Sequence, residues 1–298
     1  PRTRPRHAGR RLAEGARRMR RSPAAVTRCL NAMEARLGVR LIERTTRWIA
    51  PTEAGRRLVE HARKVLDDYQ EALHDIGGDA RNAAGVLRVT APLAFGRLHL
   101  APVVAGFLAQ HPQVKVELVL SNAIVDLRES GIDLALRIGH LADSSLVAKA
   151  VGEVRHLVVG SPDYLALRGR PQAVDDLRQH DAILLSTADG IREWQFQVPG
   201  RGVVGLLPSS RFSVNQAETA IEAACAGCGL IRVLSYQVAP EIATGRLVPV
   251  LRAFEMAPVP VSLVFASARF MPLRLRLFVD FAAGALKQGP AFQAVADG

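Results

Sequence analysis

The sequence predicts an α/β protein with an all-α segment at its N-terminal end. From residue 86 onward, apolar stretches typical of strands alternate with stretches of helical periodicity, which indicates a parallel sheet with helical crossovers. Before that point the pattern is a helix, a short basic hairpin and a second helix. Charge divides in the same way: residues 1–80 hold 18 Lys and Arg against 10 Asp and Glu, a net +8 of the total +11. A basic front before a nearly neutral body is typical of a nucleic-acid-binding module attached to another domain.

The first predicted helix follows Ser22, which we interpret as its N-cap. Pro23 occupies the first helical position, where its missing N–H costs nothing, and Gly38 ends the helix. One face is apolar and is expected to pack inward: Val26, Leu30, Met33 and Leu37. The opposite face carries groups suited to base edges and phosphates: Thr27, Arg28 and Asn31.

A basic hairpin is predicted next. A short apolar stretch from Val39 to Ile42 leads into Arg44-Thr45-Thr46-Arg47, and Pro51-Thr52-Glu53 opens a new helix with Thr52 as its N-cap. This order is typical of a winged helix-turn-helix, in which the helix enters the major groove and the hairpin contacts phosphates. The alternative is a solvated, arginine-rich helix pair. The predicted DNA-binding residues are Ser22, Pro23, Thr27, Arg28, Asn31, Arg44, Thr45 and Arg47.

This segment resembles the DNA-binding region of LysR-type transcriptional regulators. The resemblance is carried by Ser22, Ala25-Val26-Thr27-Arg28, Glu34 to Gly38, Arg40-Leu41, Glu43-Arg44-Thr45 and Thr52-Glu53-Ala54-Gly55. It covers residues 13–286 and implies three parts: a winged helix-turn-helix domain over 1–57, a linker and dimerisation helix over 53–78, and an effector-binding domain over 86–286. Residues 1–21 hold nine arginines, with only Leu12, Ala16 and Met19 at helical spacing. We therefore expect the DNA-binding domain to be atypical or incomplete before residue 22.

The second helix, residues 53–76, has a heptad pattern. Its apolar residues recur at alternating spacings of four and three: Leu58, Ala62, Val65, Tyr69, Ala72 and Ile76. Such a seam predicts pairing with a second copy of the helix. The alternative is an amphipathic helix that packs on its own domain. Gly77-Gly78 ends the helix, and residues 79–85 form a polar hinge.

The body is expected to contain strands at 86–90, 114–120 and 134–138, separated by helices at 98–109 and 122–130. Further strands are predicted at 157–160, 182–185, 211–215, 230–234 and 259–266, a hairpin at 194–207, and helices at 163–167, 174–179, 217–226 and 272–286. The resemblance implies that the body forms two α/β lobes, like a periplasmic binding protein. Lobe I would span about 86–160 and 267–286, and lobe II about 161–266.

Ligands of open parallel sheets bind beyond the carboxyl ends of the strands. The loops predicted there, to which the resemblance also points, supply nine candidate effector-binding residues: Pro92, Leu93, Ala94, Ser121, Asn122, Arg137, Gly139, Ser186 and Asn215. Each has a structural alternative. Ser121 is also suited to capping a helix, Arg137 to pairing with Asp133 or with a neighbouring subunit, and Asn215 to capping the helix that begins near Ala217.

The sequence offers no predicted catalytic residue, metal site or cofactor site. Cys225 and Cys228 form an isolated C-x-x-C, which we interpret as small packing residues, with redox sensing as the alternative. Cys29 is interpreted as a filler of the first helix. The eight histidines show no metal-binding spacing. Three cysteines give no disulfide framework and no apolar run approaches the ~18 residues of a membrane span, so we expect a cytoplasmic protein without a membrane partner.

The predicted function is that of a LysR-type transcriptional regulator, which is not an enzyme. The resemblance implies operator binding modulated by a small-molecule effector held between the two lobes. Its expected partners are double-stranded DNA, the effector, RNA polymerase and further copies of the chain, as a homodimer or homotetramer. The alternatives are a solute-binding protein, a sensor with the same lobes that is defective in DNA binding, and a metabolic enzyme on the two-lobed fold.

Overall fold

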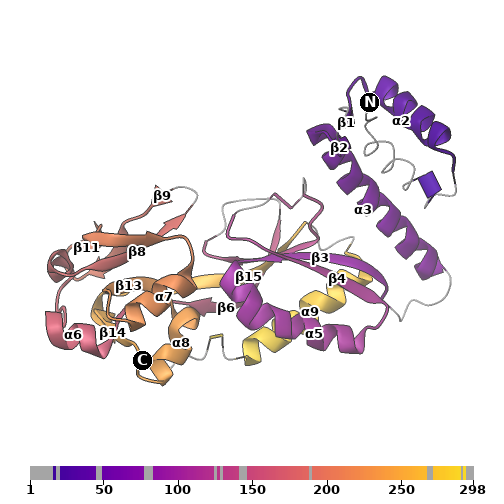
Figure 1. The fold of residues 1–298 in the computed structure, drawn as a ribbon. Coiled ribbons are helices and arrows are strands. Elements are labelled where there is room, and N and C mark those ends of the chain that lie inside the picture. Colours follow the sequence, from indigo (N-terminus) through magenta and orange to yellow (C-terminus); the bar gives the residue numbers. More distant parts are fainter. Residues whose placement is uncertain are drawn as a thin grey trace, which may run out of the picture. The chain divides into compact units, whose positions relative to one another are not determined.

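The computed structural model describes residues 16–17, 21–44, 49–76, 83–123, 126–127, 130–140, 146–187, 190–266, 271–289 and 291–292 (Figure 1). The chain divides into two compact units. The first comprises residues 1–79 with 128–131, and the second comprises residues 80–127 and 132–298.

The first unit contains the predicted helix, hairpin and helix. They are α2 (Pro23–Leu37), the antiparallel pair β1 (Ile42–Arg44) and β2 (Ile49–Pro51), and α3 (Glu53–Ile76). Ser22 caps α2 by accepting a hydrogen bond of 3.2 Å from the Ala25 N–H, and Gly38 ends the helix with a φ of 67°. Both signals act locally. The Ser22 side chain satisfies a backbone N–H at the helix start, and Gly38 adopts the left-handed conformation that ends a helix.

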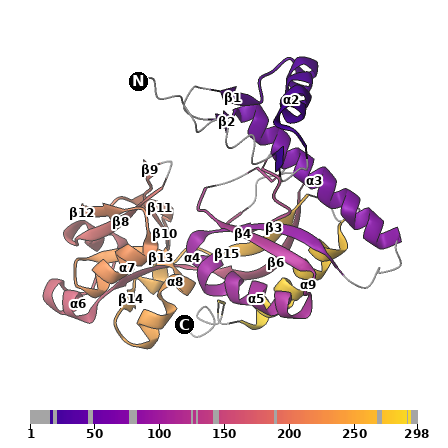
Figure 2. The same cartoon turned by 45° about the vertical axis from the view of Figure 1, so that its right-hand side comes forward.

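Lobe I of the second unit is a five-stranded sheet in the order β4-β3-β5-β15-β6 (Figure 2). β3 (Gly85–Ala91) pairs in parallel with both β4 (Val114–Leu120) and β5 (Leu134–Ile138), as the sequence predicts. β15 (Val259–Phe265) and the edge strand β6 (Val147–Val154) complete the sheet in antiparallel pairs. One face is covered by α5 (Ala101–Gln110) and α9 (Leu273–Gln288), where Phe107 meets Phe278 edge-on at 5.0 Å.

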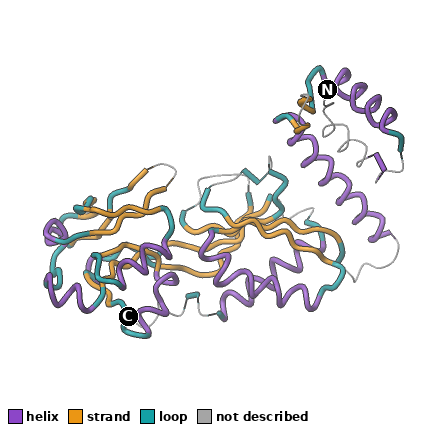
Figure 3. Tube along the Cα trace, viewed as in Figure 1, coloured by secondary structure: helices purple, strands orange, loops and turns teal. Residues whose placement is uncertain are grey.

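Lobe II is a second sheet, in the order β12-β8-β13-β7-β14 with β9 (Gly190–Ile191) added to β8. The strands are β7 (His156–Gly160), β8 (Ala182–Thr187), β12 (Ser210–Val214), β13 (Leu230–Leu234) and β14 (Val248–Val250). Two helices, α7 (Ala217–Cys225) and α8 (Ser235–Ala243), pack on one face of this sheet (Figure 3). The other face is covered by α6 (Pro162–Arg168), the 3₁₀ turn Val174–Gln179, and the hairpin of β10 (Trp194–Val198) and β11 (Gly202–Leu206).

The expected limits of the lobes are wrong at both crossings. β7 pairs with β13 and so belongs to lobe II, whereas β15 pairs with β5 and β6 and belongs to lobe I. The chain therefore crosses near Arg155 and again between Leu251 and Pro258. Apolar strands look alike in sequence whichever sheet they join, so the position of the crossings was not visible in the pattern.

Two helices differ from their predicted positions. The predicted helix 98–109 begins earlier: α4 (Leu93–Phe95), a π-helical turn (Gly96–Leu100) and α5 run on continuously. Of the predicted helix 122–130, the described residues 122, 123, 126, 127 and 130 adopt turns, bends or irregular backbone and are not helical. Leu93–Gln110 is long and apolar enough to cross a membrane by length and composition, but its Phe95, Leu100 and Phe107 are fully buried in the core of lobe I.

Candidate DNA-binding and effector-binding sites

The basic groups of α2 lie at its exposed surface. Arg28 is exposed and Thr27 is half-buried, so both predicted groove-facing side chains are at least partly accessible to solvent. Asn31 is exposed but makes an interaction within the chain. Ser22 and Pro23 form the exposed start of the helix, whose backbone N–H groups are suited to a phosphate.

The expected inward face of α2 is only partly covered in this chain. Val26 and Leu30 are half-buried, whereas Met33 and Leu37 are 41% and 49% exposed. The prediction of a continuous buried stripe is therefore wrong for its C-terminal half. Helical spacing shows which side chains share a face but not how far a neighbouring element covers them.

The hairpin is held against both helices by side-chain hydrogen bonds. The Glu34 carboxylate on α2 accepts from the N–H groups of Leu41 at 2.7 Å and Ile42 at 3.1 Å. Thr52, the N-cap of α3, donates its hydroxyl to the Arg40 carbonyl at 2.6 Å and accepts from the Gly55 N–H at 3.0 Å. These bonds fix the base of the hairpin relative to α2 and to the first turn of α3.

Gly55 lies in direct contact with the base of the hairpin. A Cβ at this position would overlap the carbonyl oxygen of Leu41. The same oxygen accepts a hydrogen bond of 2.9 Å from the Thr52 N–H. The close approach of α3 to the hairpin therefore requires a residue without a side chain. Arg44 ends β1, while Thr45 and Arg47, the predicted phosphate contacts of the tip, lie outside the described residues.

The apolar seam of α3 is exposed where the structure describes its side chains. Val65 is 65% exposed, Tyr69 58% and the neighbouring Leu66 61%, while Leu58 is half-buried. The side chains of Ala72 and Ile76 lie outside the described set. Apolar side chains that are solvated at heptad spacing are typical of a helix that pairs with a second copy.

The carboxyl edges of the two sheets face each other within the second unit. α4 and the π-helical turn follow β3 in lobe I, and α7 and α8 follow β12 and β13 in lobe II. Phe95 packs edge-on against Tyr236 at 5.1 Å, and the Arg97 guanidinium pairs with the Glu218 carboxylate at 3.1 Å. These contacts join the same loops from which the candidate effector residues were chosen.

In lobe I, Pro92, Leu93, Ser121 and Asn122 come together as predicted, but as a capped helix start. The Leu93 N–H donates to the Asn122 side-chain oxygen at 3.0 Å, and the Ser121 hydroxyl oxygen accepts from the Ala123 N–H at 3.1 Å. Leu93 and Ala94 lie inside α4 instead of in a loop, and Ala94 is buried. The Leu93 N–H is therefore not free for a ligand, and the prediction is wrong on this point.

Arg137 and Gly139 lie near the end of β5, beside these loops. Arg137 is half-buried, burial lowers its pKa, and it makes an interaction within the chain. Gly139 has a φ of 118° and donates its N–H to the Pro260 carbonyl at 2.9 Å. Gly139 therefore has a structural role where the chain leaves the sheet.

In lobe II the two candidate residues differ in setting. Ser186 lies within β8, paired with Ile191, and not in the expected loop. Asn215 follows β12 and is exposed, and the N-cap position of α7 is Gln216. The alternative of Asn215 as the helix cap is therefore wrong.

Sequence reasoning missed the groups that join the two lobes. Arg97 and His99 lie in the π-helical turn. Tyr236 lies in the first turn of α8, and its ring centroid is 5.5 Å from that of His99. Burial lowers the pKa of His99, and its Nε2 is buried without a hydrogen-bond partner in the described structure. The only sequence signal for these groups was the position of Arg97 and His99 close after the predicted loop at residues 90–94.

The cysteines are free thiols in three different settings. Cys29 is exposed, so its interpretation as a filler is wrong. Cys225 packs at the edge of the lobe II core, where burial raises the pKa of its thiol, whereas Cys228 is exposed. Within the described ranges, no group of three or more His, Cys, Asp or Glu is placed to hold a metal ion.

Two family models match the chain. One, described as the LysR substrate binding domain, matches residues 80–287, and the other, described as a bacterial regulatory helix-turn-helix protein of the lysR family, matches residues 9–56. The chain belongs to the LysR family of transcriptional regulators. This LysR-type regulator thus combines a DNA-binding helix-turn-helix with an effector-binding domain. The match from residue 9 extends the helix-turn-helix pattern further forward than the resemblance read from residue 13.

Relatives match the regulator over most of its length. The HTH-type transcriptional regulator CrgA of Neisseria meningitidis serogroup B is 30% identical over 259 residues, which cover 87% of this chain and 86% of CrgA. A regulator of Xanthomonas campestris pv. campestris is 33% identical, over 86% of this chain and 75% of its own. The solved CrgA structure covers 92% of this chain and 93% of its own with a TM-score of 0.62 at 30% identity. The full-length Vibrio cholerae virulence activator AphB has the same coverage and TM-score at 27% identity.

A pH dependence of stability follows from His156 at the start of β7. Burial, and secondarily the charge of Arg232, lowers its pKa to about 4. The unfolded chain has a histidine pKa of ~6.5, so between these values only the unfolded state takes up the proton. The free energy of unfolding is therefore highest above pH ~6.5. It decreases as the pH falls from there toward 4, by at most ~1.4 kcal/mol per pH unit. We expect His156→Gln to flatten this slope in urea unfolding between about pH 7 and pH 5. His140→Gln, at an exposed histidine, is the control, and an unchanged slope in His156→Gln would contradict the assignment.

Proposed function

We propose that this LysR-type regulator has a DNA-binding domain over residues 1–57, in which α2 and the hairpin contact the operator. Two copies of the chain pair through α3, which lies within a dimerisation segment of residues 53–78. Support comes from the exposed Arg28 between a capped helix start and a hairpin that is fixed by Glu34 and Thr52. Arg28 and Thr27 contact base edges, while Arg44, Thr45 and Arg47 contact phosphates. A two-fold dimer or tetramer would match a nearly palindromic operator.

The effector-binding domain of this proposal senses a small molecule at the facing carboxyl edges of the two lobes. Ser121, Asn215 and Arg137 are its proposed contacts, and the Arg97–Glu218 pair closes the same region. Effector binding changes the relation between DNA-binding units and, through it, contact with RNA polymerase. In this proposal the regulator acts in the cytoplasm and carries out no catalysis, and turnover of any compound in a metabolite screen would contradict the second point.

The test of operator reading is Arg28→Ala. Loss of a base contact costs ~1–3 kcal/mol, about 5- to 150-fold in affinity, and relaxes the preference for the operator over random DNA. Arg36→Ala, at an exposed arginine in the last turn of the same helix, is the control and should keep the preference. Quantitative gel shifts measure both. Unchanged affinity and preference in Arg28→Ala would remove α2 from the groove.

The test of the effector residues is the double variant Ser121→Ala/Asn215→Ala. The probe is the compound of a metabolite panel that raises the melting temperature of the wild type most, and that changes its operator affinity. We expect the double variant to need at least ~5-fold more of this compound, because lost hydrogen bonds cost ~0.5–1.5 kcal/mol each. Ser213→Ala, on an exposed strand position, is the control. An unchanged response would refute the choice of residues.

A further inference from the structure

Tyr236 of lobe II has its side chain in the core of lobe I. It lies in the first turn of α8, and Val238 and Ile242 of the same helix pack in the core of lobe II. Tyr236 is 3% exposed and belongs to the buried cluster that the lobe I sheet and its helices form. Residues two positions apart on a helix point to different sides, so the start of α8 holds both lobes at once.

The seat of this ring is built by the first helix of lobe I. Phe95 of α4 meets Tyr236 edge-on with ring centroids 5.1 Å apart, and His99 of the π-helical turn meets it edge-on at 5.5 Å. Phe95 is fully buried, and its ring lies 6.2 Å from that of Phe292, so the seat is fixed within lobe I. Aromatic pairs at such distances and angles are favourable beyond the area that they bury.

The phenol oxygen of Tyr236 closes the start of the same helix. Burial, and secondarily the charge of Glu218, raises the pKa of the phenol, whereas a hydrogen bond from the Phe95 backbone acts in the opposite direction. A backbone group favours the charged phenolate only as a donor, so the Phe95 N–H donates to the phenol oxygen. The Leu93 N–H donates to Asn122 at 3.0 Å. Two of the N–H groups that a helix start leaves free are therefore occupied, one by each lobe.

Two further features make this junction reversible. The ion pair between Arg97 and Glu218 spans it at 3.1 Å, but both side chains are partly exposed, so the pair contributes little by itself. The Nε2 of His99 is buried beside the Tyr236 ring without a hydrogen-bond partner in the described structure. Such a group opposes burial, because water would satisfy it once the lobes part. Burial of the Tyr236 ring therefore holds the junction against a built-in cost.

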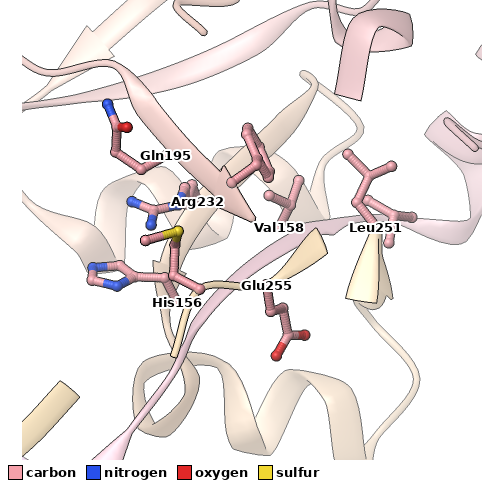
Figure 4. A pocket seen from close by; sticks show the side chains of 9 residues that line it. His156, Val158, Gln195, Arg232, Leu251 and Glu255 are labelled. Atoms are coloured by element: carbon pink, nitrogen blue, oxygen red, sulfur yellow. The ribbon is translucent and has the colours of Figure 1, made fainter. Parts of the chain in front are cut away.

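Tyr236 takes the place that a small molecule at the facing edges of the lobes would need. The N–H groups at the helix start of lobe I suit a ligand, but those of Leu93 and Phe95 are already bonded. The hollow of lobe II, lined by His156, Gln195 and Arg232 among others, offers no alternative, because it has room for about one water molecule (Figure 4). An effector at the facing edges therefore has to displace Tyr236 to reach the Phe95 N–H.

We propose that Tyr236 is a lock between the lobes: its side chain, seated in lobe I, holds them together, and the effector acts by displacing it. Release of the side chain changes the relation between the lobes, and operator affinity changes with it. The proposal rests on the proposed effector function and names the step by which a bound ligand acts. The lock itself is a property of the chain alone, so it is tested without DNA and without a ligand.

The first experiment is hydrogen exchange of the full chain, read by mass spectrometry in peptides that cover residues 93–100. We expect these amides to exchange at least ~10-fold faster in Tyr236→Ala, because the Phe95 N–H loses its partner and the helix start loses its cover. The matched control is Tyr164→Ala, which removes a similarly buried tyrosine whose described contacts lie within lobe II. Equal exchange in wild type and Tyr236→Ala, or equally fast exchange in Tyr164→Ala, would overturn the lock.

The second experiment changes exposed side chains and leaves the core intact. Glu218→Arg places like charges across the junction, and Arg97→Glu/Glu218→Arg restores the pair with its charges exchanged. The single variant should speed exchange at residues 93–100 by at least ~3-fold and change operator affinity in gel shifts by at least ~5-fold, and the double variant should return both toward wild type. Glu222→Arg is the matched control, since it breaks an ion pair with Arg246 inside lobe II.

The two measurements separate the lock from the function that it serves. Wild-type exchange in Glu218→Arg, or a double variant no closer to wild type than the single variant, would overturn the lock. Faster exchange at residues 93–100 with wild-type operator affinity would overturn its role in regulation. A wild-type chain that binds no operator would refute the proposed function, while the exchange rates would still decide whether Tyr236 locks the lobes.

Discussion

Gly55→Ala is expected to disable the DNA-binding unit. The added Cβ would overlap the Leu41 carbonyl oxygen, so either the start of α3 or the base of the hairpin has to move. Overlap with backbone cannot be relieved by a rotamer change, and we expect a cost of about 3 kcal/mol. The same movement would disturb the hydrogen bonds that Thr52 makes to Arg40 and Gly55.

The measurement is operator affinity together with thermal unfolding. We expect at least ~100-fold weaker operator binding, with the second unit still folded. Gly38→Ala is the matched control: its φ of 67° is strained for alanine, at ~1–2 kcal/mol, but nothing lies within 4 Å of the added Cβ. Gly38→Ala should therefore bind the operator better than Gly55→Ala. Equal or stronger binding by Gly55→Ala would show that α3 and the hairpin are not in the contact described.

Val65→Ser/Tyr69→Ser is expected to dissociate the regulator into monomers. Both side chains are exposed in the single chain and lie on the heptad seam of α3. Burying an apolar side chain of this size stabilises by ~1.5–3 kcal/mol, and a two-fold pair buries each residue twice. Loss of all four side chains should raise the dimer dissociation constant by at least ~1,000-fold.

Light scattering across a concentration series measures this change. Arg57→Ser, at an exposed position one residue before the seam begins, should keep the oligomeric state. Because a dimer gains from two half-sites, operator affinity should fall together with dimerisation. If the double variant remains a dimer at the concentrations at which the wild type is a dimer, α3 is not the pairing helix.

The parts of the fold that were predictable are those in which local chemistry decides. Ser22, Pro23 and Gly38 define α2 because caps and stops act on neighbouring backbone groups. The apolar helical segment α5 separates β3 from β4, so the parallel pairing of these two strands followed from the order of elements.

The parts that could not be predicted depend on the tertiary structure. β6 reads VAKAVGEV, in which small and charged residues alternate, because it is an edge strand with one face near solvent. α8 holds Pro240 in its interior, a residue that sequence reasoning treats as a helix breaker.

The site residues were harder to predict for the same reason. Asn122 was predicted as a ligand contact but caps α4, since both roles require the same short amide side chain at the same helix start. Arg97, His99 and Tyr236 were overlooked, because the contact between the two lobes forms only in the tertiary structure.

The most direct test of the account is operator binding by this chain, measured by gel shift at two salt concentrations on the promoter region beside its own gene. We expect an oligomer to bind this region specifically, with an affinity that falls steeply as the salt concentration rises, because lysine and arginine contacts to phosphates release counterions. A folded oligomer that binds this region no better than random DNA at either salt concentration would contradict it.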